Sequence, residues 1–78
     1  MPTVMRREGW RFFFYSDEHE PKHIHAEKGD AYIRIELDLA EVTDCYRVSP
    51  REIKKVLRIV EQEKEYIKKA WDEYFTEE

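Results

Sequence analysis

The last third of the chain carries one uninterrupted amphipathic pattern, which restricts the fold more than any other feature of the sequence. After Pro50 the chain contains neither Gly nor Pro, and apolar residues recur at helical spacings of three and four. These apolar positions are Ile53, Val56, Leu57, Val60, Ile67, Trp71, Tyr74 and Phe75. Ser49 can cap the free amides, Pro50 suits the first turn, and Glu52 completes a capping box. The sequence therefore predicts one long helix over residues 49–76, after a linker at 40–48.

The residues before the linker alternate between apolar and charged side chains with a period of two, which is typical of strands with one buried face. In residues 31–39 the apolar positions are Ile33, Ile35, Leu37 and Leu39. Residues 23–27 are the natural partner strand, because Lys28-Gly29-Asp30 supplies a turn between the two segments.

A second pair of strands is predicted at the N-terminus. The run from Trp10 to Tyr15 is almost entirely aromatic and has high β propensity. Glu8-Gly9 supplies a two-residue turn that joins this run to residues 3–7. The whole chain, 1–78, is therefore expected to be one α+β domain. Its β-rich half, 1–39, forms a small antiparallel sheet of two hairpins, about four strands, packed on one long C-terminal helix.

The predicted helix is longer than the predicted sheet. A helix over residues 50–75 would measure about 39 Å, whereas strands of five to nine residues span about 17–30 Å. The last turn carries Trp71, Tyr74 and Phe75, which would be costly to leave in water. These three residues either fold back onto the N-terminal hairpin or form a partner-binding surface, for a second copy in a homodimer or for another protein.

Every histidine of the chain lies in the segment 19–27. On a strand, His23, His25 and Glu27 share one face, and Ile24 points to the other. If the helix covers the face of Ile24, as the apolar pattern favours, the two imidazoles are left accessible on the opposite face.

Three readings of this face follow from the residues. His23, His25 and Glu27 could bind a divalent metal, because imidazoles and a carboxylate are suitable ligands. Alternatively, His23 and His25 could act as catalytic groups together with Arg34 on the adjacent strand, as in a metal-independent ribonuclease. The third reading is a polar sheet face without chemistry. The sequence alone leaves the choice open, and with it the question whether the chain is an enzyme.

Charge and composition exclude other classes of function. The net charge is −4, whereas nucleic-acid binders usually carry a basic footprint, so RNA binding is not favoured. The only glycines are Gly9 and Gly29, so the sequence has no phosphate-binding loop, and no organic cofactor is expected. The lone Cys45 favours a reducing compartment. No segment resembles a signal peptide or membrane span, so a cytoplasmic location away from membranes is expected.

Five motifs of the chain resemble those of one small bacterial family. They are Met1-Pro2-Thr3-Val4, the run from Trp10 to Ser16, Pro21-Lys22-His23-Ile24-His25, Ser49-x-x-Glu52 and Ala70-Trp71-x-x-Tyr74-Phe75. In this order they are similar to the family called domain of unknown function 4160, whose hallmark His-x-His segment corresponds to His23 and His25. Two positions depart from the pattern: Lys22 stands where a second proline is common, and Arg47 stands where the family tends to have glycine.

The resemblance implies no established activity. Members of the family resemble one half of gene pairs that look like toxin–antitoxin modules. The leading hypothesis is therefore a small toxin–antitoxin-like or regulatory component that acts through a partner protein, with a ribonuclease-like face at His23 and His25. The alternatives are a metal-binding accessory domain that uses His23, His25 and Glu27, and a purely structural dimerisation module.

Overall fold

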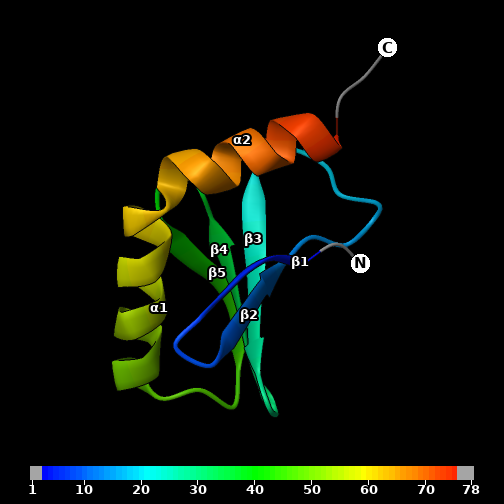
Figure 1. Ribbon diagram of the computed structural model, residues 1–78. Helices are drawn as coiled ribbons and strands as arrows, with labels where there is room; N and C mark the ends of the chain where they lie inside the picture. The colour runs from blue at the N-terminus through cyan, green and yellow to red at the C-terminus, as the bar shows by residue number, and fades with distance from the viewer. Residues whose placement is uncertain (1–2, 76–78) are drawn as a thin grey trace.

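The computed structural model describes residues 3–75, which form a sheet of five strands followed by two helices (Figure 1). The strands are β1 (Thr3–Arg7), β2 (Trp10–Phe13), β3 (His23–Lys28), β4 (Ala31–Glu36) and β5 (Glu41–Tyr46). The helices are α1 (Pro50–Gln62) and α2 (Lys64–Tyr74). Neighbouring strands are antiparallel, and their order in the sheet is their order in the chain. The predicted α+β class and antiparallel sheet are confirmed.

Both predicted hairpins are present. Glu8 and Gly9 have φ angles of 52° and 87°, and positive φ at both positions is what a two-residue turn of type I′ requires. This turn joins β1 to β2. The turn between β3 and β4 is shorter than predicted and consists of residues 29–30, because Lys28 still pairs with β4.

The sheet has one strand more than the four expected. The segment 40–48, predicted to be a linker, contains β5, which pairs with β4 at the edge of the sheet. Within this strand only Val42 is partly buried, and its other five residues are exposed. An edge strand that buries so little has no apolar alternation, so the pattern that identified the other strands is missing here. The strand ends before Arg47, whose φ of 53° lies in the left-handed region where glycine is favoured.

The single long helix predicted for 49–76 is in fact two helices. The backbone leaves helical geometry at Glu63, with φ −107° and ψ 18°. The chain bends there, so that α1 runs beside the strands and α2 turns across their end (Figure 1). The bend removes the predicted overhang, because both helices can then bury an apolar face on one short sheet. Neither Gly nor Pro marks the position, and residue 76 lies outside the described part of the chain. Within residues 3–75 no helix is long and apolar enough to cross a membrane.

The start of α1 follows the prediction at Ser49 and Pro50, whereas the Glu52 side chain is used for another contact than the predicted capping box. The Ser49 hydroxyl accepts a hydrogen bond from the amide of Glu52 (3.2 Å), and Pro50 occupies the first helical position. The carboxylate of Glu52 turns to the sheet, where it accepts a hydrogen bond from the indole Nε1 of Trp10 (3.2 Å). The helix start is thereby connected to β2 as well as capped.

The apolar core lies between the helices and one face of the sheet. Its buried members are Met5, Trp10, Phe12, Phe14, Ile24, Ala26, Ile33, Ile35, Leu37, Val56, Ile59, Val60, Ile67 and Trp71. The alternation predicted for the fourth strand is confirmed as far as Leu37. Leu39 is 67% exposed, because β4 ends at Glu36 and the chain turns away before reaching it.

The aromatic end of α2 folds back onto the segment that follows β2. The ring of Trp71 lies 5.4 Å from that of Phe14 and 4.5 Å from that of Phe75, between ring centroids. Trp71 is only 4% exposed, whereas Tyr74 is 45% exposed. Of the two arrangements considered for these residues, the structure shows the intramolecular one. A partner-binding role for Trp71, Tyr74 and Phe75 stays a prediction.

Candidate functional site

The histidines lie on the sheet face opposite Ile24 and Ala26, but they are not accessible. His23 and His25 are 3% and 4% exposed, and the alternating residues Ile24 and Ala26 are fully buried in the core on the other side. The strand periodicity therefore predicted the correct face for each side chain. The expectation that this face would leave the imidazoles in contact with solvent was wrong.

The loop between β2 and β3, residues 14–22, covers the two imidazoles. The ring of His25 stacks against Phe13 (5.4 Å) and Tyr32 (5.8 Å), and the edge of Tyr15 closes it from the loop side at 4.6 Å. The ring of His23 lies 5.2 Å from Trp71 of α2. The site is thus enclosed by aromatic rings from two strands, a loop and the last helix.

A second contact fixes this loop to α2. The Nζ of Lys22 lies 2.8 Å from a carboxylate oxygen of Asp72, and the Asp72 hydrogen bond raises the pKa of the lysine. The pair is largely exposed, so its contribution to stability is small, but it positions the residue that precedes His23.

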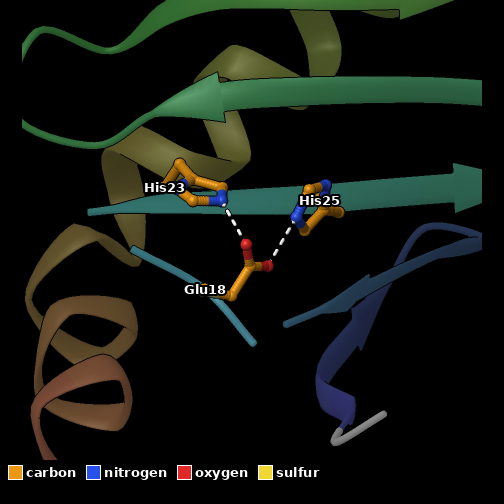
Figure 2. A group of neighbouring side chains, drawn as sticks. All are labelled: Glu18, His23 and His25. Carbon is orange, nitrogen blue, oxygen red and sulfur yellow. Dashed lines mark hydrogen bonds and ion pairs between the residues drawn. The ribbon is translucent and has the colours of Figure 1, made fainter. Parts of the chain in front are cut away.

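Glu18 connects the two histidines. Its Oε1 lies 2.7 Å from the Nε2 of His23, and its Oε2 lies 2.6 Å from the Nε2 of His25 (Figure 2). The amide of Tyr15 donates a further hydrogen bond to Oε2 (2.9 Å). The Glu18 side chain is 8% exposed, so a carboxylate carried by a polar loop is buried between two imidazoles.

The Nδ1 atom of each imidazole forms a hydrogen bond with a group outside the triad. The Nδ1 of His23 lies 2.8 Å from the carbonyl oxygen of Pro21, and the Nδ1 of His25 lies 2.7 Å from the hydroxyl of Tyr32. Both rings are therefore fixed at both nitrogens, and both Nε2 atoms point to the same carboxylate.

These contacts determine where the protons lie. A carbonyl oxygen only accepts hydrogen bonds, so the Nδ1 of His23 carries a proton and donates it to Pro21. The short contact from the Nε2 of His23 to Glu18 then requires a second proton between the two atoms. His25 needs no extra proton, because its Nε2–H can donate to Glu18 while its Nδ1 accepts from Tyr32. One proton is therefore shared between His23 and the carboxylate.

The pKa values of the neighbouring groups agree with this arrangement. Burial lowers the pKa of His25 below its usual value, although Glu18 opposes the shift, so a neutral ring is favoured. Burial raises the pKa of Tyr32 and keeps its hydroxyl a donor. For Glu18, burial alone would raise the pKa, but hydrogen bonds from Tyr15 and both histidines outweigh it and lower the pKa. The ionised form of the Glu18 carboxylate is thus favoured.

The same geometry suits a divalent metal. One ligand atom from each of Glu18, His23 and His25 can be chosen so that all lie within 4.8 Å of one another. In a tetrahedral site with metal–ligand distances of about 2.0–2.1 Å, neighbouring ligand atoms are about 3.3 Å apart. To reach this spacing, the carboxylate would have to withdraw from the Nε2 atoms at 2.7 and 2.6 Å, and ligand atoms that lie up to 4.8 Å apart would have to draw together. The Pro21 carbonyl and the Tyr32 hydroxyl are outer partners of the kind that orient metal-bound histidines.

The residues named from the sequence are only partly brought together. His23 and His25 are adjacent, but Glu27 lies apart from them and binds Arg11 through its Oε2 (2.7 Å to Nη1). Arg34 lies opposite His25 in the register of β3 and β4, and its buried Nε is without a hydrogen-bond partner among the described residues. The sequence analysis did not identify Glu18. The only indication in the sequence was that Glu18 is an acidic residue in the loop before the strand that carries the histidines.

A small pocket of about 240 Å³ adjoins the site beside Glu18. Its lining residues come from the loop and from the end of α2, and they are Glu18, His19, Glu20, Trp71 and Phe75. The pocket therefore lies next to the member of the triad that the loop contributes.

Comparison with known proteins gives a family and no activity. No curated protein and no solved structure matches the chain. The family model described as a domain of unknown function, DUF4160, matches residues 9–72 of the 78. This match includes the loop, both histidines and the part of α2 that packs on them, and the chain therefore belongs to the DUF4160 family.

Proposed function

We propose that the chain is a metal-binding domain that holds one divalent transition-metal ion through Glu18, His23 and His25. The observation that supports this is the convergence of both Nε2 atoms on one carboxylate while both Nδ1 atoms are held by outer partners. An ion at this point would replace the proton shared by His23 and Glu18. The Nε2 proton of His25 would have to move to its Nδ1, where the Tyr32 hydroxyl can accept the hydrogen bond. In this proposal Glu18 takes the place that the sequence analysis gave to Glu27.

The donor set indicates the kind of metal. Two imidazole nitrogens and one carboxylate oxygen suit zinc and other first-row transition metals. Calcium and magnesium prefer sites built from oxygen ligands. The aromatic rings around the triad lower the local polarity and strengthen the attraction between the ion and the carboxylate. We therefore expect zinc, cobalt or nickel to bind and calcium and magnesium not to compete.

The ribonuclease-like alternative has less support in the geometry. Such chemistry needs an imidazole within hydrogen-bond reach of a substrate hydroxyl, whereas His23 and His25 are buried and their Nε2 atoms are occupied by Glu18. Arg34, with its unpartnered Nε, is the observation that favours this alternative. RNA cleavage that persists in the presence of a chelator and is lost in Arg34→Gln would support it against the metal proposal.

The wider role suggested by the family resemblance stays a prediction. A toxin–antitoxin-like or regulatory component that acts through a partner protein is compatible with a metal-binding domain. An ion that fixes the loop can determine the surface that the loop presents to a partner. A cytoplasmic location and a homodimeric state are likewise expectations. Co-purification tests for the partner protein, and light scattering of the isolated protein tests for the homodimer.

Titration of the metal-free protein with zinc or cobalt tests the proposal, with calorimetry and cobalt absorption as the measurements. We expect one ion per chain and a loss of affinity of at least about tenfold in Glu18→Gln, His23→Gln and His25→Gln. The matched control is Glu27→Gln, which removes the carboxylate of the neighbouring strand position and should bind like the wild type. Absence of binding at millimolar metal, or an equal loss in Glu27→Gln, would overturn the proposal.

A further inference from the structure

The three proposed ligands leave one position of a tetrahedral ion unfilled. Structural zinc sites are almost always closed by four protein ligands, whereas catalytic sites keep the fourth position for water or substrate. Which of the two this site becomes depends on whether the chain can supply another donor. The triad is enclosed by aromatic rings on most sides, so a fourth donor has to come from the pocket beside Glu18.

We propose that His19 is the fourth ligand, so that Glu18, His19, His23 and His25 form a closed site around one zinc-type ion. This inference rests on the proposed function. It assigns the site a regulatory or structural use in place of hydrolysis, because a four-coordinate ion has no position left for an attacking water.

His19 lies beside the proposed ligand Glu18. It follows Glu18 directly, so their Cα atoms are about 3.8 Å apart, and both residues line the same pocket. No other imidazole lies in the described part of the chain besides the two already assigned.

His19 is also free to turn. Its side chain is 85% exposed, and its nearest ionic neighbour is Asp17 at 4.0 Å, a carboxylate that is itself 96% exposed. Contacts of this kind contribute little to stability, so rotating the ring toward the ion breaks nothing of consequence. The imidazole is therefore an available donor, held only by this exposed contact with Asp17.

Glu20 is the competing donor, because it lines the same pocket. The backbone beside it is fixed, since the next residue, Pro21, accepts the hydrogen bond from His23. The charge of Glu20 also favours Lys22, whose pKa it helps to raise. A nitrogen donor is moreover the better match for zinc, cobalt or nickel than a second carboxylate. These points favour His19.

Cobalt spectroscopy of the full chain tests the inference. Four-coordinate cobalt absorbs strongly in the visible range, and its band changes when azide occupies a free position. We expect the wild type to give a strong band that azide does not change. His19→Gln should bind cobalt about tenfold or more weakly, with a weaker band that azide shifts. Glu20→Gln is the matched control from the same loop and pocket and should behave as the wild type.

The outcomes separate the inference from the proposed function. If the wild type binds cobalt, His19→Gln binds it equally well and azide shifts both spectra, the fourth position is open and His19 is not a ligand. If Glu20→Gln shows the losses expected of His19→Gln, the carboxylate closes the site and the inference is wrong. If the wild type binds no cobalt, the proposed function itself fails. Circular dichroism of the metal-free variants checks that they fold, as exposed substitutions should.

Discussion

The two faces of β3 are both closed to solvent, but by different means. Ile24 and Ala26 belong to the apolar core, in which side chains from both helices and from the neighbouring strands share the contacts among many partners. His23 and His25 are buried by one loop, a few aromatic rings and the single carboxylate of Glu18. The first face is held by non-directional packing, and the second depends on a small number of directional hydrogen bonds.

Within this one strand, the Ile24 face therefore determines stability alone, and the histidine face carries the groups that can respond to pH and ions. Packing of apolar groups hardly depends on pH or on ions in solution. The histidine face contains a shared proton and a buried carboxylate, so its closure depends on both. We therefore expect substitutions on the Ile24 face to change stability alone, and changes on the histidine face to alter stability together with its response to pH and metal.

The largest effect is expected on the helix-covered face. Ile24→Ala removes buried methyl groups and leaves a cavity, which should lower the free energy of unfolding by about 2–5 kcal/mol. Urea denaturation followed by circular dichroism measures the loss. Because a small domain can unfold completely after such a change, Ile24→Val serves as the milder companion, with an expected loss of about 0.5–1.5 kcal/mol. Any change in the cobalt affinity of folded Ile24→Val would contradict the separation of the two faces.

A smaller loss of stability is expected on the histidine face. Glu18→Gln keeps the size of the side chain but leaves the His23–carboxylate contact without its charge, which should cost about 1–3 kcal/mol in the metal-free protein. Glu20→Gln is the control, since an exposed change in the same loop should stay within about 0.5 kcal/mol. Equal urea midpoints for Glu18→Gln and the wild type would show that the carboxylate does not hold the loop.

The smallest effect concerns the pH dependence of the same face. The pKa of His25 lies below its usual 6.5 in the folded protein, so the unfolded chain takes up a proton first as the pH falls, and stability decreases from about pH 6.5 downward. The pKa of Glu18 lies below its usual 4.5, which adds a second loss at lower pH. Urea midpoints from about pH 7.5 to about pH 4 should therefore decline.

The histidine variant identifies the source of this decline. In His25→Gln the upper part of the decline should disappear, while Ile24→Val should keep the wild-type pH profile with a constant offset. A His25→Gln profile parallel to that of the wild type would assign the acid sensitivity to other groups.

Much of the helix-covered face could be predicted from the sequence, because its signal is periodic. Ile33, Ile35 and Leu37 are buried as their alternation indicated, and the amphipathic pattern after Pro50 gave the helical segment and its start. The failures occur where periodicity carries no information. β5 buries almost nothing, and the bend at Glu63 is a response to the length of the sheet, which no local residue type marks.

The histidine face was predicted in part for the same reason. Alternation correctly placed His23 and His25 together and opposite Ile24. It also suggested Glu27 as their companion, since a strand pattern can only nominate residues of the strand. Glu18 comes from an irregular loop that folds over the sheet, and the path of such a loop is determined by tertiary contacts such as the packing of Tyr15 on His25.

The bend at Glu63 has a consequence for the order of events during synthesis. Because α2 turns across the end of the sheet, Trp71 reaches a ring that precedes it by 48 positions in the chain, that of His23. The strands, the loop and the first helix all leave the ribosome before Trp71 can pack against His23. An ion bound at the triad before α2 is made would therefore lack the Trp71 side of its surroundings.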